Sequence, residues 1–268
     1  MRMKKITLYF AVFSMVARLL CVYPSAEGKS YSWYCAHVKD HVQPTVAKEL
    51  SFVEECGAYY IDRTHVSTDD PDKVIYLTFD AGYENGNVAK VLDVLKEENV
   101  PGAFFVLGHL ISHEQNLIMR IKEEGHLVCN HTVRHRDMSR ASEEDFLKEL
   151  RELEDQYRTL TGDEMPKYYR PPEGKFSRNN LEVASDHGYQ TVFWSFAYPD
   201  WDNQKQMSHE KAKQIILENL HNGEVMLLHP TSAVNAEILG DVIREAKAQG
   251  YRFGTLDELT GGKHENSQ

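Results

Sequence analysis

The stretch Lys73-Val-Ile-Tyr-Leu-Thr-Phe-Asp80-Ala-Gly82 decides the fold. Its residues 74–79 are mainly apolar, β-branched or aromatic, which predicts a buried strand. Asp80 and Gly82 then put a carboxylate and a turn at the carboxyl end of that strand, where α/β proteins present catalytic groups. An Asp at this position also commonly caps a turn. The rest of the chain has to decide between the two roles.

From Lys73 onward, strand-like runs alternate with amphipathic helical patterns. Strands are expected at 74–79, 103–107, 127–129, 168–170, 191–195, 225–228 and 251–254, and helices at 88–98, 115–124, 143–160, 179–187, 209–221 and 236–249. Several helical patterns end in a glycine just before the next strand, as helix-stop glycines do. We therefore predict the α/β class, with a single irregular (β/α) barrel of about seven strands over residues 73–260. A doubly wound open sheet is the alternative, although no nucleotide-binding glycine motif follows the first strand.

Two other regions flank this domain. Residues 1–26 combine a basic start, an apolar run and a terminal Ala26, a pattern typical of a secretory signal peptide. An uncleaved membrane anchor is the alternative, although Arg18 interrupts the apolar run. Residues 27–72 are expected to form an N-terminal extension packed on the barrel, with a helix near 46–55. We expect 261–268 to be a flexible tail.

Charge and cysteine content narrow the choice of partner and compartment. The net charge is −11, and removal of 1–26, which holds four basic and no acidic residues, would make it −15. Such a chain is a poor candidate for nucleic-acid binding, which depends on neutralising phosphates. Cys35 and Cys56 could pair in an oxidising compartment. Cys129 lies in a strand-like run and is expected to be a small core residue.

Polar residues follow five of the predicted strands. They are Asp80, His131, His135, Arg170, Asp200 and His229, the titratable set of a hydrolase. His131 and His135 are four residues apart, a spacing that places two imidazoles on one face of a helical turn, where they can chelate a metal ion. A structural role is the alternative for each residue: His229 as a core histidine, for example, or Arg170 in a plain ion pair.

Five motifs, in order along Lys73–Leu259, resemble those of the polysaccharide deacetylases of carbohydrate esterase family 4, which contain the NodB homology domain. The motifs are Thr78-Phe-Asp-Ala-Gly82, His131-Thr-Val-Arg-His135, Arg170-Pro-Pro-Glu-Gly174, Asp200-Trp201 and Leu228-His229-Pro230. The phrases Tyr83-Glu-Asn-Gly86 and Trp194-Ser-Phe-Ala-Tyr-Pro-Asp-Trp201 further resemble the delta-lactam-biosynthetic de-N-acetylase branch. This resemblance implies removal of the acetyl group from N-acetylmuramic acid in peptidoglycan, on the way to the muramic δ-lactam of spore cortex.

The resemblance also implies a role for each motif residue. The catalytic residues would be Asp80 as general base, Arg170 orienting it, His229 as general acid and Asp200 holding His229. His131 and His135 would bind a divalent metal. Substrate would contact Trp201 and Leu228, which wall the acetyl pocket, and also Glu173 and Tyr83.

The chain departs from the family pattern at two of these places. Ala81 stands where the usual first motif has a second Asp, the third metal ligand, and alanine supplies no ligand atom. A metal would then be held by His131 and His135 with water, Asp80 or substrate, and two histidines still favour zinc or another transition ion. Glu173 stands where many relatives have an aromatic residue.

The expected protein is therefore an extracytoplasmic, monomeric enzyme that acts on peptidoglycan glycan strands without a protein partner. Within the same fold, the alternatives are a deacetylase of N-acetylglucosamine in peptidoglycan or chitin, or an acetylxylan esterase. From another class, the loss of the ligand at Ala81 could mark a catalytically silent glycan-binding domain.

Overall fold

The computed structural model describes residues 28–262. The predicted signal peptide and residues 263–268 of the predicted tail therefore lie outside the described residues. Within the described part, no helix is long and apolar enough to cross a membrane. In chain order the elements are β1 (Ser30–Ser32), the 3₁₀ helix η1 (Lys48–Val53), β2 (Ala58–Tyr59), β3 (Lys73–Ala81), α1 (Asn87–Glu98), β4 (Ala103–Val106), α2 (Gly108–His113), α3 (Gln115–Glu123), β5 (Leu127–Asn130), α4 (Glu143–Thr161), β6 (Tyr168–Tyr169), η2 (Pro172–Gly174), β7 (Lys175–Ser177), α5 (Arg178–Asp186), β8 (Gln190–Val192), α6 (His209–Glu218), β9 (Glu224–Leu228), α7 (Ala233–Ala248), β10 (Tyr251–Gly254) and α8 (Leu256–Leu259).

One parallel sheet forms the centre of the molecule. Its strands lie in the order β10-β3-β4-β5-β6-β8-β2, and β9 pairs with the other side of β3. Beyond β8, Phe196 bridges to Met226 of β9, and the amide of Leu227 donates to the carbonyl of Phe196 at 2.9 Å. The sheet therefore curls until the chain after β8 reaches β9, which confirms the irregular barrel and excludes the open doubly wound sheet.

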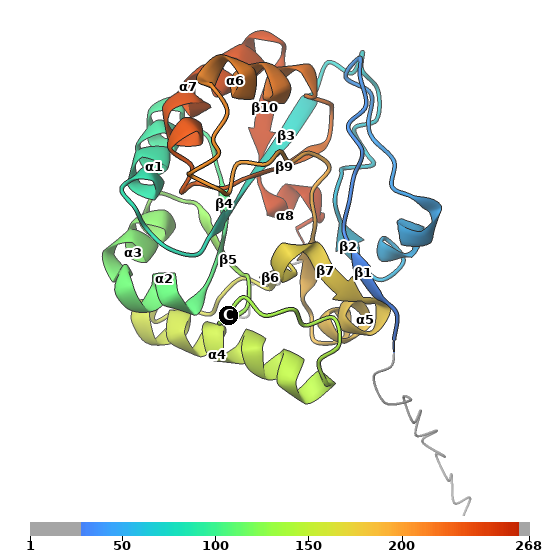
Figure 1. Ribbon diagram of the computed structural model, residues 1–268, viewed down its shortest axis with the longest axis vertical. Coiled ribbons are helices and arrows are strands. Elements are labelled where there is room, and N and C mark those ends of the chain that lie inside the picture. The colour runs from blue at the N-terminus through green and yellow to red at the C-terminus, as the bar shows by residue number, and fades with distance from the viewer. Residues whose placement is uncertain (1–27, 263–268) are drawn as a thin grey trace, which may run out of the picture.

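Strand β3 shows how the sequence divides between the two faces of this sheet. Successive side chains of a strand point to opposite faces. Ile75, Leu77 and Phe79 belong to the apolar cluster between the sheet and the helices, whereas Val74 and Tyr76 belong to the cluster inside the curl. Figure 1 shows α1, α2, α3, α4, α6 and α7 around this sheet, with the segment before β3 along the remaining side.

That N-terminal segment does more than pack on the barrel. β1 pairs antiparallel with β7, while β2 joins the main sheet in parallel beside β8. The sheet therefore includes a strand that precedes Lys73, the residue at which the barrel was predicted to begin. The helix expected near 46–55 is the short η1, and α2 was not predicted, because its six residues are too few for a helical period to be recognised.

The three described cysteines are free and buried. The disulfide considered for Cys35 and Cys56 is not formed; both side chains lie in the apolar cluster of the N-terminal segment. Cys129 is fully buried inside the curl, as its strand-like surroundings predict.

Candidate active site

A cavity of about 780 Å³ opens at the carboxyl ends of the strands. It is lined by Asp80, Gly82, Tyr83, Leu107, His131, His135, Glu173, Trp194, Ala197, Tyr198, Trp201, Leu227, His229 and Thr231. Seven of the ten predicted site residues are among these. Two more, Arg170 and Asp200, are 0% and 1% exposed and contact the lining from below. Parallel strands bring these distant residues together because all their carboxyl ends lie at one edge of the sheet.

Asp80 and Arg170 form a buried ion pair at the floor of the cavity. Arg170 Nη1 donates to Asp80 Oδ1 at 2.9 Å, and its other nitrogens reach Thr78 Oγ1 and the carbonyls of Val192 and Phe193. The guanidinium also lies 4.1 Å from the ring centre of Phe105. These contacts fix the arginine from three strands and leave Asp80 Oδ2 free to act on a bound molecule.

The pKa of Asp80 is set by opposing effects. Burial raises the pKa of Asp80. His131, Arg170 and His229 together lower it by more than burial raises it, so the pKa lies below its usual value. His131 is itself neutral at pH 7, since burial lowers its pKa to about 4. Arg170, which is always protonated, is therefore the nearest charge that keeps Asp80 ionised at neutral pH.

His131 and His135 lie together, though not on a helix. They belong to the loop after β5, in which Thr132 and His135 have positive φ values of 68° and 54°. The helical turn expected from their spacing is therefore wrong, yet the loop still brings the two ring centres to 5.0 Å. Non-glycine residues in this conformation are strained and occur often at functional sites.

The loop is held by the neighbouring helix. Glu149 of α4 accepts from the backbone nitrogen and the Nη1 of Arg134, and the side-chain Nδ2 of Asn130 donates to the carbonyl of Leu150. These bonds from α4 fix the loop that carries both histidines.

The orientation of His131 is defined by one hydrogen bond. Its Nδ1 lies 2.8 Å from the carbonyl oxygen of Arg170, which can only accept, so Nδ1 carries the proton. The lone pair of Nε2 then faces Asp80 Oδ2 at 3.5 Å. A neutral imidazole with its Nε2 free is the form that binds a metal.

The side chains beside His131 suit a metal ion that takes only some of its ligands from the protein. Among the described residues, no group of three or more His, Cys, Asp or Glu side chains is arranged to hold a metal. Ala81 is fully buried in the apolar cluster behind β3 and adds no ligand. His131 and His135 can supply two nitrogens, with Asp80 beside them, and the remaining positions would be left to water or substrate.

Asp200 and His229 form a second acid–base pair on the same cavity. Asp200 Oδ1 accepts from His229 Nδ1 at 2.7 Å, and Oδ2 accepts from the His229 backbone at 2.8 Å and from Asn235 Nδ2 at 2.5 Å. Burial lowers the pKa of His229, but the bond and charge of Asp200 outweigh this, and the pKa is raised. His229 can therefore hold a proton on Nε2, which faces the cavity.

Aromatic side chains surround the opening. Trp201 is 62% exposed and meets His229 edge to face at 6.2 Å between ring centres, and Tyr83 is 45% exposed. Trp194 and Tyr198 also line the cavity but were not predicted as site residues. The phrase that runs from Trp194 to Trp201 contains both, so its density of aromatic residues was the available signal.

The structure corrects one substrate contact. Leu228 is 1% exposed and belongs to the apolar cluster behind the sheet, whereas its neighbour Leu227 lines the cavity. The two residues face opposite sides because strand side chains alternate. Leu227 is therefore the leucine that a ligand would meet.

Glu173 lies at the rim, on a strained turn. Its φ is 55°, and its carboxylate is 2.7 Å from Lys175 Nζ. The next residue, Gly174, has a φ of 65°, and a Cβ there would come within 2.9 Å of Trp194 and 3.0 Å of Trp33. Glycine at this position lets the turn approach both tryptophans and holds Glu173 over the cavity.

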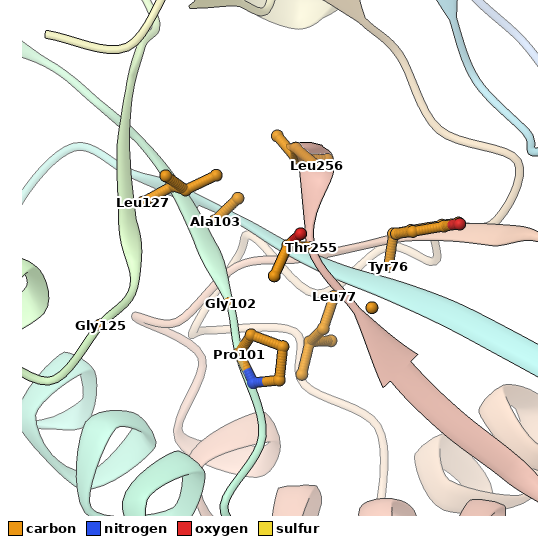
Figure 2. A pocket seen from close by; sticks show the side chains of 10 residues that line it. Tyr76, Leu77, Pro101, Gly102, Ala103, Gly125, Leu127, Thr255 and Leu256 are labelled. Atoms are coloured by element: carbon orange, nitrogen blue, oxygen red, sulfur yellow. The ribbon is translucent and has the colours of Figure 1, made fainter. Parts of the chain in front are cut away.

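A second cavity lies away from this chemistry (Figure 2). It measures about 10 Å³ and is lined by Tyr76, Leu77, Pro101, Gly102, Ala103, Gly125, Leu127, Gly254, Thr255 and Leu256. This is room for about one water molecule. Tyr76 is its one titratable lining residue, and the hydroxyl already donates to Asp62 Oδ2 at 2.5 Å. This cavity is a packing gap.

Comparison with known proteins agrees with this geometry. Residues 67–192 match the family model described as polysaccharide deacetylase. The peptidoglycan-N-acetylmuramic acid deacetylase PdaA of Bacillus subtilis is 39% identical over 229 residues, 85% of each chain. The chain belongs to the polysaccharide deacetylase family.

Solved structures and a second group of relatives extend the comparison. The structure of Bacillus subtilis PdaA, a family 4 carbohydrate esterase, matches this deacetylase with a TM-score of 0.82 and 38% identity over 88% of this chain and 99% of that one. A peptidoglycan-N-acetylglucosamine deacetylase of Bacillus cereus is 32% identical over 69% of this chain and 67% of its own. The family indicated by the five motifs and the irregular barrel predicted from the alternating strands and helices are thereby confirmed.

Proposed function

We propose that this deacetylase hydrolyses the N-acetyl group of N-acetylmuramic acid in peptidoglycan strands, the step that leads to muramic δ-lactam in spore cortex. The observation that carries the proposal is the pair of acid–base couples, Asp80 with Arg170 and Asp200 with His229, on one cavity. The similarity to PdaA supports the choice of muramic acid.

Asp80 is proposed as the general base. Arg170 occupies Oδ1, so Oδ2 is the oxygen that takes a proton from the water attacking the acetyl carbonyl. A base must be ionised before the reaction, and the low pKa of Asp80 meets this need. A positioned base contributes about 10²–10⁴-fold to the rate.

His229 is proposed as the general acid. An amine is a poor leaving group unless its nitrogen gains a proton as the C–N bond breaks. His229 Nε2 can deliver that proton, because Asp200 fixes the ring through Nδ1 and stabilises the imidazolium. Asp80 and His229 thus act on opposite ends of the same amide.

We propose that His131 and His135 hold a divalent metal, with zinc as the favoured ion. When bound there, such an ion would polarise the acetyl carbonyl and lower the pKa of a water. The neutral state of His131, which follows from its buried position, supports this role.

The sugar itself would lie against the aromatic rim. Trp201 and Tyr83 offer exposed rings on which a sugar can pack, Leu227 offers an apolar wall for the acetyl methyl group, and Glu173 can accept hydrogen bonds from hydroxyl groups. The cavity volume is within the range of about 300–1,000 Å³ usual for ligand sites.

The substrate requires an extracytoplasmic location. The signal-like pattern of residues 1–26 supports export, and a monomer that acts on glycan strands without a protein partner remains our expectation. Removal of acetyl from N-acetylglucosamine is the second candidate, because relatives with that activity are about one-third identical. A silent glycan-binding domain would need neither hydrogen-bonded acid–base couple.

The test is acetate release from peptide-stripped peptidoglycan strands, with and without a chelator, followed by mass spectrometry to locate the new amine. We expect amines on muramic acid and loss of release with the chelator. Amines on glucosamine alone would overturn the choice of sugar. An active wild type and an Asp80→Asn variant that binds glycan without turnover would separate the enzyme from a silent binding domain.

A further inference from the structure

A second pair of histidines lies outside the cavity, on α2. His109 and His113 are four residues apart on this helix, and both side chains are exposed. Their ring centres are 4.1 Å apart with 31° between the ring planes. This is the helical arrangement that the sequence suggested for His131 and His135, which the loop after β5 does not adopt.

From this pair we infer a second metal site, for a divalent transition ion such as Zn²⁺, Ni²⁺ or Cu²⁺. Two nitrogens bound at 2.0–2.1 Å to one tetrahedral ion lie roughly 3.4 Å apart. Rings already 4.1 Å apart reach that separation by side-chain rotation, with no change in the helix.

The hydrogen bonds of His113 go through one of its two ring nitrogens. His113 Nδ1 lies 3.0 Å from the carbonyl of His109 and 2.9 Å from Ser112 Oγ, whereas its Nε2 has no hydrogen-bond partner among residues 28–262. Among the described residues, neither ring belongs to a group of three or more possible ligands. The ion would therefore keep water in its other positions.

The site is separate from the proposed catalytic ion. Neither His109 nor His113 lines the cavity, although α2 begins directly after Leu107, which does. Exposure of both rings favours rapid exchange of the ion, whereas His131 is buried. The α2 pair should bind more weakly than the loop pair and be more open to chelators.

Isothermal titration calorimetry of the full-length protein with Zn²⁺ and with Ni²⁺ at pH 7.5 tests this inference. Wild type should bind about two ions per chain, and the double variant His109→Gln with His113→Gln about one, with acetate release unchanged. Each single variant should weaken the affinity of the α2 site for the ion by about 10²-fold or more, because a single imidazole cannot chelate the ion. The matched control is His187→Gln, which removes another exposed histidine, one that contacts no other histidine ring among residues 28–262.

The outcomes separate this site from the catalytic proposal. If the double variant on α2 keeps the same number of ions and the same affinities as wild type, the second site does not exist. If the double variant His131→Gln with His135→Gln keeps both binding classes, the proposed catalytic ion is wrong, and the α2 site is judged by its own variants. Circular dichroism of each variant checks that the fold is retained.

Discussion

Replacing Asp200 by Asn is the sharpest test of the proposed general acid. Asp200 accepts three hydrogen bonds, from His229 Nδ1, the His229 backbone and Asn235. Asparagine has one acceptor oxygen. If this oxygen serves the backbone and Asn235, its NH₂ group faces Nδ1, which must then give up its proton. The ring of His229 would then be neutral, and adding a second proton to it would cost more free energy, because Nδ1–H would face an NH₂ group instead of a carboxylate.

The size of the effect follows from the bond that is lost. A hydrogen bond to a charged group contributes about 1.5–3 kcal/mol. Loss of this bond should lower the pKa of His229 and, at 1.36 kcal/mol per factor of ten, make its protonation about 10–10²-fold less favourable. Activity needs the protonated form, so the raised pKa in wild type extends activity to higher pH, and the variant should lose activity at a lower pH. At neutral pH, the protonated fraction of His229 and with it turnover should fall by up to about 10–10²-fold.

The assay is the pH dependence of acetate release between pH 5 and 10. The control is Asp202→Asn, two residues away, whose carboxylate pairs with exposed Lys205 and does not contact His229. An Asp200→Asn enzyme whose alkaline limb coincides with that of wild type would refute the role of His229 as the acid held by Asp200.

Four further substitutions test the site and its surroundings. Arg170→Met leaves the buried Asp80 without its partner, so stability should fall by about 3–5 kcal/mol in urea denaturation; a loss below 1 kcal/mol would contradict the buried ion pair. Leu228→Ala should lower stability by about 2–5 kcal/mol with little change in KM, whereas Leu227→Ala should mainly raise KM; the reverse result would mean that the two faces of β9 are misassigned. Gly174→Ala should destabilise the protein by more than about 1 kcal/mol and raise KM, because Gly174 has a positive φ and a Cβ there would press against two tryptophans. An unchanged midpoint of thermal unfolding would rule this out.

Much of the candidate site could be predicted because its residues follow strands in an alternating βα pattern. Asp80, His131, Arg170 and His229 were each found at a predicted strand end, and the parallel sheet gathers such ends at one edge. Leu227 could not be chosen over Leu228, because β9 is apolar on both faces and shows no alternation.

The amino-acid sequence by itself determined the α/β class, the order of the main elements and the motifs of the family, since these depend on local periodicity and on residues close in the chain. Only the tertiary structure decided how distant residues meet. β2 joins the sheet through a pairing with β8, which lies more than a hundred residues away in the chain. The loop after β5 has local hydrogen bonds from Thr132 and His135, but it is also held by bonds to Glu149 and Leu150 of α4. Such contacts depend on packing between elements, which no local pattern encodes.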